Sequence, residues 1–170
     1  MSPATSLDAL LDHHAVIDAC YRYAAAVDRT ARELTDEAFD DYATTMTEDC
    51  VVDYGPLGCF ESRAAWLAFA RGLAERGGLC HHMYANFFVE VDGDIASARF
   101  HAQAMHFWPD QPVEHQLLVA AGIFDNRLRR TDEGWKLARV QPNVQFIHDP
   151  GAAAARMFPP TSEGAQPAPA

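Results

Sequence analysis

The sequence has few basic residues, no long apolar run and no paired cysteines, and each shortage excludes a class of protein. Its 13 Lys and Arg stand against 24 Asp and Glu, which gives a net charge of -11 without any basic cluster. Such a charge argues against binding to nucleic acid or to an anionic membrane surface. No segment approaches the roughly 20 apolar residues of a membrane span, and the N-terminus lacks the features of a signal peptide. We therefore expect a cytoplasmic protein with a neutral or apolar partner.

Signatures of disulfide, metal and nucleotide chemistry are also missing. The four cysteines show neither a CxxC pair nor zinc-ligand spacing, so we expect free thiols that are buried as small apolar groups. The glycine-rich loops that bind nucleotides and the nucleophile-elbow motif of hydrolases do not occur. The sequence therefore predicts chemistry that uses no cofactor and no metal ion.

Helical periodicity dominates the first half of the chain. Residues 7–28 carry apolar side chains at helical spacing and contain no Gly or Pro. Thr35 is placed to cap a short helix over residues 36–46, and Ser62 is placed to cap a third helix over residues 63–73.

A period of two replaces the helical period in the second half. Asp92-Gly93 is a strong hairpin signal, and a second turn follows at residues 132–134. The predicted strands cover residues 50–54, 86–91, 95–108, 116–129 and a last one from Trp135. Helices followed by antiparallel strands describe an α+β domain whose helices cover one face of a curved sheet. We expect a single domain over residues 1–158 and a disordered Pro/Ala-rich tail over residues 159–170.

The long strand over residues 95–108 predicts a cavity. Its polar face carries Ser97, Arg99, His101 and Gln103, while its inward face carries four alanines and His106 between aromatic residues. Four alanines on a core-facing strand leave volume that something else must fill. His106 could be a satisfied core histidine, or it could be the polar group of an apolar ligand pocket.

Asp28 favours the ligand pocket. It belongs to a stripe with spacings of 3 and 4 residues, which predicts that it points inward; the stripe is Leu10, His14, Ile17, Tyr21, Ala24 and Asp28. A buried carboxylate needs a partner, because an unpaired one is costly or loses its charge. We expect Asp28 to accept a hydrogen bond from His106. A structure that separates the two would favour a non-catalytic binding protein.

His81 and His82 are neighbours in a strand-like segment, so only one of them can face the cavity. Together with His106 and Asp28, that histidine could also form a two-His-one-carboxylate metal site. This metal site is an alternative that we do not favour.

Several weak motifs occur in an order that resembles the nuclear-transport-factor-two-like superfamily, and within it the SnoaL-like and scytalone-dehydratase-like enzymes. The motifs are a tyrosine-rich helix end before Asp28, Asp53-Tyr54, N-x-x-V-x-V-D-G-D at residues 86–94, His106, residues 122–128 and Gly-Trp-Lys-Leu at residues 134–137. The resemblance covers roughly residues 7–148. It implies a cone-shaped α+β barrel in which a curved antiparallel sheet and N-terminal helices enclose an apolar pocket.

The resemblance also implies roles for individual residues. Scytalone dehydratase has an Asp–His pair, which corresponds to Asp28 with His106. Its second histidine corresponds to one of His81 and His82, and one of its tyrosines corresponds to Tyr54. His82 stands four residues before Asn86, as the histidine does in the family pattern, which favours His82. An alignment that is extended back from Asp94 without a gap favours His81 instead. Val27 and Phe124 replace the family's other tyrosine and its asparagine, and Tyr23 could supply the missing hydroxyl as in related bile-acid dehydratases. Candidate catalytic residues are therefore Asp28, His82, His106, Tyr54, His81 and Tyr23, and candidate substrate-binding residues are Phe100, Trp108, Phe124, Asn143 and Trp66.

A His–Asp pair in a dry pocket can take a proton from carbon beside a carbonyl and deliver it to a leaving hydroxyl, while a tyrosine stabilises the enolate. We expect water elimination from a hydrophobic carbonyl compound such as a polyketide or steroid-like metabolite. Isomerisation through an enol and aldol-type ring closure use the same groups. The alternative from another class is a non-catalytic ligand-binding or structural member of the fold. An epoxide hydrolase of this superfamily would need a second inward Asp, which we do not find.

The outer face of the sheet predicts self-association. Helices on the inner face cannot also cover the outer face. On the outer face, the strand over residues 116–129 presents either Leu117, Val119, Ala121 and Ile123 or the residues that alternate with them. An apolar band left in water marks an interface. We therefore expect a homodimer or a homotrimer in which each subunit has its own cavity.

Overall fold

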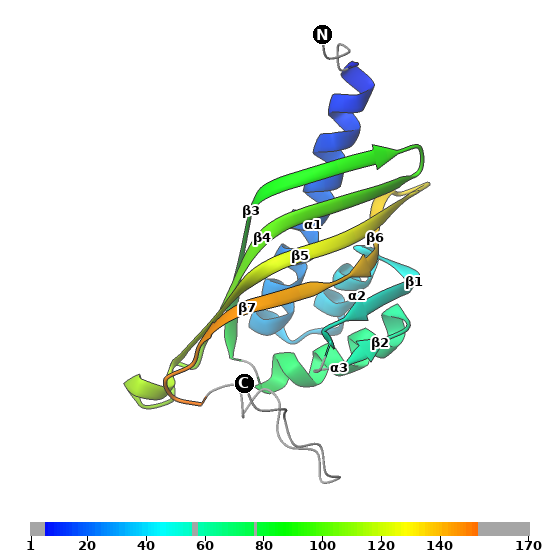
Figure 1. The fold of residues 1–170 in the computed structure, drawn as a ribbon. Coiled ribbons are helices and arrows are strands. Elements are labelled where there is room, and N and C mark those ends of the chain that lie inside the picture. The colour runs from blue at the N-terminus through cyan, green and yellow to red at the C-terminus, as the bar shows by residue number, and fades with distance from the viewer. Residues whose placement is uncertain (1–5, 56–57, 77, 153–170) are drawn as a thin grey trace.

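The computed structural model describes residues 6–55, 58–76 and 78–152. Within these ranges, three helices lie against the concave side of a strongly curved sheet (Figure 1). Both the α+β class and the cone-shaped arrangement predicted from the sequence are confirmed. The predicted tail over residues 159–170 lies outside the described residues.

The three helices occupy the predicted parts of the chain, with different ends. Helix α1 spans Leu7–Glu33, α2 spans Asp36–Thr44 and α3 spans Arg63–Arg76. Both predicted caps are confirmed: the side chain of Thr35 accepts from the backbone N–H of Ala38 at 3.2 Å, and that of Ser62 accepts from Ala65 at 3.2 Å. These bonds satisfy amide groups that a helix start leaves without an intrahelical partner.

The strands of the described residues form one sheet of seven. They are β1 (Met46–Asp53), β2 (Cys59–Phe60), β3 (Leu79–Asp92), β4 (Ile95–Phe107), β5 (Leu117–Thr131), β6 (Gly134–Val140) and β7 (Pro142–His148). The order across the sheet is β2-β1-β6-β5-β4-β3, and β7 pairs with β5. The predicted meander from β3 to β6 is confirmed. β2 and β7 were not predicted, and neither was the parallel pairing of β1 with β6.

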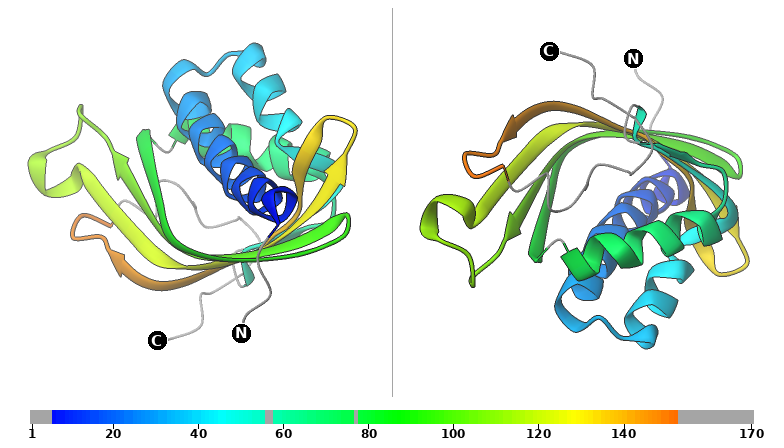
Figure 2. Two further views of the ribbon diagram at one scale, coloured as in Figure 1. Left: turned by 90° about the horizontal axis from the view of Figure 1, so that it is seen from above. Right: turned by 90° about the horizontal axis from the view of Figure 1, so that it is seen from below.

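β5 holds the sheet together and helps to curve it. One edge of β5 pairs with β4 along its whole length, while the other edge pairs with β7 in its first half and with β6 in its second. Register shifts in the β3/β4, β5/β6 and β5/β7 ladders bend the strands. At Gly122, a Cβ atom would lie 2.1 Å from the carbonyl oxygen of Asn143, so only glycine allows β7 to approach this closely. The sheet consequently curls around α1 and α3 (Figure 2).

The buried face of α1 differs from the predicted stripe. Its buried residues are Val16, Ala19, Cys20, Tyr23, Ala24 and Thr30, whereas Leu10 and Tyr21 are 56% and 47% exposed. The first turns of the helix extend past the sheet (Figure 1), and residues 7–11 are exposed. Asp28 consequently lies on the flank of the buried face rather than at its centre, and this position decides its partner.

The hydrophobic core fills the space between the helices and the concave side of the sheet. Its largest fully buried side chains include Tyr42, Phe100, Met46, Leu128 and Leu137. Ala96, Ala98 and Ala102 of β4 face this core, as predicted, while Arg99 and His101 face outward. Among the described residues, no helix combines the length and apolar character needed to cross a membrane.

Candidate active site

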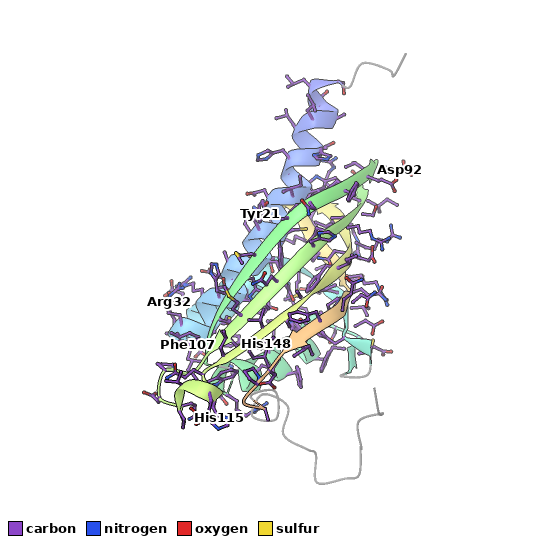
Figure 3. The ribbon with its side chains drawn as sticks, turned by 60° about the vertical axis from the view of Figure 1, so that its left-hand side comes forward. Tyr21, Arg32, Asp92, Phe107, His115 and His148 are labelled. Carbon is purple, nitrogen blue, oxygen red and sulfur yellow. The ribbon has the colours of Figure 1, made fainter. Side chains whose placement is uncertain are left out.

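A cavity lies at the end of the molecule where α1 ends, β3 begins and β4 ends. In Figure 3, Arg32 of α1 and Phe107 of β4 mark this end, and Asp92 marks the opposite one. The polar side chains that line the cavity include Tyr23, Tyr54, Cys80, His82, Tyr84 and His106, and most of the remaining wall is aliphatic or aromatic. Few polar groups in an apolar cavity are typical of small-molecule sites.

Asp28 and His82 form a hydrogen-bonded pair in this site. Nδ1 of His82 lies 2.7 Å from Oδ1 of Asp28, and the backbone N–H of His82 donates to Oδ2 at 3.1 Å. The thiol of Cys80 donates to Oδ1 at 3.4 Å. The two side chains are only 17% and 13% exposed. Hydrogen bonds to a charged group contribute about 1.5–3 kcal/mol each, so the ring of His82 is firmly oriented.

The pair also determines which ring nitrogen of His82 carries the proton. Burial alone raises the pKa of the Asp28 carboxyl, but the bonds from His82 and Cys80 outweigh it and hold this pKa below its usual value. Asp28 is therefore ionised at neutral pH, and a carboxylate can only accept. In a neutral ring, Nδ1 must then carry the proton that is donated to Asp28, and Nε2 has the lone pair; the ring lines the cavity.

The predicted bond between Asp28 and His106 is wrong. Asp28 lies on the flank of α1 that packs against β3, the edge strand, whereas His106 is on β4, one strand further into the sheet. His106 still lines the cavity, where its ring stands edge-on to that of His82 with centroids 6.3 Å apart. It also stacks on Trp108 at 6.1 Å. The paired histidine is therefore His82, and His106 is the second one.

The two neighbouring histidines face opposite ways, as predicted for a strand. His82 is on the cavity side, while the side chain of His81 is 63% exposed and its Nδ1 lies 3.8 Å from Oδ2 of Asp28. The preference for His82 over His81 as the inward residue is confirmed. A bulge near Asn86, whose φ is 57°, shifts the register of β3. It lies between His82 and Asp94, which explains why the alignment back from Asp94 favoured His81 while the spacing to Asn86 favoured His82.

A chain of buried hydrogen bonds ends at Tyr23. The indole N–H of Trp66 donates to the hydroxyl of Tyr42 at 2.7 Å, and this hydroxyl donates to that of Tyr23 at 3.0 Å. Burial raises the pKa of Tyr23 and Tyr42 above the usual value, so both remain protonated. Tyr23 consequently keeps its own proton for a ligand. Tyr42 was not predicted from the sequence, because a buried aromatic residue of a short helix carries no local sign of this role.

Two further tyrosines, Tyr54 and Tyr84, line the cavity. Tyr54 stacks on Trp66 with centroids 5.3 Å apart, and burial raises its pKa to about 12. No hydrogen bond within the described part of the chain engages the hydroxyl of Tyr54 or Tyr84. Tyr84 was missed in the sequence, and so was Cys80. Both stand two residues from His82 in one strand, and this spacing could have placed them on its face.

The predicted substrate-binding residues divide into two groups. Trp66 and Phe124 line the cavity. Phe100 does not: it is 1% exposed and lies in the core, packed against Tyr84 and Phe124. The other two residues that fail to line the cavity are Trp108, whose indole N–H donates to the carbonyl of Arg76, and Asn143, which pairs with Ile123 on the outer face. Strand alternation beyond the bulge beside Gly122 turns Asn143 outward.

Comparison with known proteins gives a family match for most of the chain. A family model described as the SnoaL-like domain matches residues 8–141. A relative is the uncharacterised protein Rv2910c of Mycobacterium tuberculosis strain H37Rv. It is 32% identical over 122 residues, which cover 69% of this chain and 74% of the relative.

Solved structures with the same fold include the Kfla4162 protein of Kribbella flavida, with 24% identity and a TM-score of 0.73 over 87% of this chain and 100% of that one. A candidate scytalone dehydratase of Novosphingobium aromaticivorans has 19% identity and a TM-score of 0.71 over 82% and 88%. The hexachlorocyclohexane dehydrochlorinase LinA-type3 of Novosphingobium barchaimii has 17% identity and a TM-score of 0.68 over 84% and 92%. At these identities, the likeness establishes the fold alone.

Proposed function

The chain belongs to the SnoaL-like domain family, and from this premise we propose that it is a cofactor-independent acid–base enzyme that eliminates water from a hydrophobic carbonyl compound. The observation that carries the proposal is the bond between Asp28 and His82 beside an apolar cavity. Acid–base pairs of this kind in clefts cluster at functional sites. A polyketide or steroid-like metabolite suits the aromatic wall.

The first step is removal of a proton from the carbon next to the substrate carbonyl. Nε2 of His82 takes this proton, and the Asp28 carboxylate stabilises the resulting imidazolium. The electrons of the broken C–H bond move onto the carbonyl oxygen, where the hydroxyl of Tyr54 donates a hydrogen bond to the enolate. Loss of such a donor typically costs about 2.7–4 kcal/mol of barrier.

The second step is departure of a hydroxyl from the next carbon. As the carbonyl re-forms, a double bond forms between the two carbons and the C–O bond breaks. The imidazolium of His82 returns its proton to the leaving hydroxyl, which departs as water, and the base is regenerated. His106 lines the same cavity, and we assign it the role of holding the departing water.

Isomerisation and ring closure would share the first step and differ in which bond the enolate makes. The names of two neighbours of this fold, a candidate dehydratase and a dehydrochlorinase, both describe eliminations. These names support elimination as the reaction of this chain. The choice of a hydroxyl as the leaving group rests on the likeness to scytalone dehydratase.

The proposal is tested with a panel of β-hydroxy ketones that carry one to four fused rings. In D₂O, exchange of the α-proton is followed by NMR, and formation of the enone is followed by its absorbance. We expect both signals with the wild-type protein and with His81→Ala, and neither with His82→Ala. Exchange without the enone would indicate an isomerase or a cyclase. Ligand binding that raises the melting temperature, without exchange for any compound, would identify a non-catalytic binding protein.

A further inference from the structure

Three side chains with metal-binding atoms meet at one edge of the cavity. They are Asp28 of α1 and Cys80 and His82 of β3, and one ligand atom from each lies within 4.8 Å of the other two. We propose that these residues form a binding site for a thiophilic divalent cation such as Zn²⁺, and that the bound cation switches off the His82 base. The site itself is independent of the proposed function, whereas the switch rests on it.

The donor set and its placement suit zinc. A thiolate, an imidazole and a carboxylate are its usual protein ligands, and sites with three protein ligands leave a fourth position open for water or a ligand. Cys80 and His82 line the cavity, so the fourth position would face into it. The ligand atoms of a tetrahedral zinc site lie about 3.4 Å apart, as follows from metal–ligand distances of about 2.0–2.3 Å. The Cys80 Sγ to Asp28 Oδ1 distance is already 3.4 Å, and the His82–Asp28 contact of 2.7 Å would have to open slightly.

The supporting elements make the site rigid. Cys80 and His82 are two residues apart in β3 and therefore share a face, and each already donates to the same oxygen of Asp28. A cation at the centre would replace these two donated protons. The carboxylate and a thiolate carry two negative charges, which would balance the charge of the cation in a partly buried place.

Binding changes where the proton of His82 resides. Without metal, Nδ1 carries a proton and Nε2 has the lone pair. The cation takes the lone pair of Nδ1 and the thiolate of Cys80, so the thiol proton goes to solvent and the Nδ1 proton is displaced. A neutral ring keeps one N–H group, and that proton must then sit on Nε2. One proton is released for each cation bound, and Nε2 can no longer accept a proton from carbon.

The site is tested first by titration of the metal-free protein with Co²⁺, which takes the geometry of zinc and gives a near-ultraviolet charge-transfer band when a thiolate binds it. We expect one Co²⁺ per chain, a strong band in the wild-type protein and its loss in Cys80→Ser. Cys59→Ser, which changes an exposed cysteine, is the matched control and should keep the band. His81→Ala should also keep it. Absence of the band in the wild-type protein, or its survival in Cys80→Ser, would overturn the site.

The switch is tested by nitrogen-15 NMR of the His82 ring with and without Zn²⁺. We expect Nε2 to be unprotonated in the metal-free protein and protonated in the zinc-bound one. Turnover should fall at least a hundredfold as Zn²⁺ is added, with the same apparent affinity for Zn²⁺ as the shift of the ring proton. It should return when the metal is chelated. If Nε2 stays unprotonated with zinc bound, the switch is wrong. If no compound is turned over but the cobalt band and the proton shift are seen, the proposed reaction fails while the site stands.

Discussion

At the scale of the residue, Asp28 is expected to control turnover through the ring it holds. In Asp28→Asn, the amide can donate to Nδ1 of His82, which would move the ring proton to Nε2 and remove the base. We predict a fall in kcat/KM of about 10²–10⁴, the range for positioned acid–base groups, with the fold retained. Asp18→Asn changes an exposed acid of the same helix and should retain wild-type kcat/KM. Unchanged kcat/KM in Asp28→Asn would end the hypothesis of an acid–base pair.

The neighbouring histidines provide the second prediction at this scale. His82→Ala removes the ring that contacts Asp28, whereas His81→Ala removes a ring that is 63% exposed. We expect the first change to abolish turnover and the second to leave kcat near that of the wild-type protein. The measurement is kcat for both variants under the same conditions, after circular dichroism has shown that both are folded. Equal losses would mean that both rings take part.

At the scale of the element, α1 is tied to the sheet far from the cavity by a charged contact. Arg130 of β5 donates to both carboxylate oxygens of Asp12 at 2.8 Å and lies over the ring of Trp135 at 4.5 Å. The hydrogen bonds from Arg130 hold the pKa of Asp12 below its usual value, against the opposing effect of burial. The contact therefore fastens the part of α1 that has the fewest neighbours.

The lowered pKa of Asp12 predicts how this contact depends on pH. A carboxyl whose pKa is lowered by folding stabilises the protein above its unfolded value, about 3.9, and loses that effect as the pH falls through the folded pKa. We predict that Asp12→Asn lowers Tm by a few degrees at most at pH 7 and that this difference vanishes in strong acid. Asp40→Asn, at an exposed acid without an ion pair among the described residues, should show no such difference. A Tm difference that grows in acid would contradict the assignment.

The elements were largely predictable from sequence because their signals are local. Helix caps, the Asp92-Gly93 turn and the alternation of His81 and His82 depend on residues a few positions apart. β7 escaped notice since Gln141-Pro142-Asn143 resembles a break, although proline is acceptable at the first residue of a strand. The parallel pairing of β1 with β6 has no local signal at all.

The partner of Asp28 could not be predicted, for a physical reason that concerns α1. The helix carries two sets of residues at spacings of 3 and 4, one through Leu10 and Asp28 and one through Val16 and Tyr23. Periodicity predicts the helix equally well from either set. Only the contact with β3 decides which set is buried, and this contact turns Asp28 to His82 instead of His106.

At the scale of the whole molecule, none of the described helices or strands covers the outer face of the sheet. Residues of β3, β4, β5 and β7 on this face are apolar and exposed, among them Met83, Phe107, Leu117 and Phe146 at 39% to 55%. An apolar area of this kind in water favours association. We propose that two or three copies pack through this face, each with its own cavity.

A charge on this face is the test. Val119 of β5 pairs with Met105 on one side and with His148 on the other, in the middle of the apolar area. We predict that Val119→Asp dissociates the assembly, whereas Ser97→Asp, on the polar part of the same face, leaves it intact. Sedimentation at micromolar concentration measures the mass of each variant. A wild-type species at 18.8 kDa would refute the assembly.

The position of β7 has a consequence for the order in which the protein becomes competent during its synthesis. Chains emerge from the ribosome N-terminus first, at about 5–20 residues per second, and β7 is the last described strand to appear. By the time β6 has formed, Asp28 can already bind His82. The cavity still lacks Pro142, Val144 and Ile147, which belong to β7 and line it. A nascent chain would therefore possess its base before it could retain a substrate, and capture would begin only when β7 docks along β5.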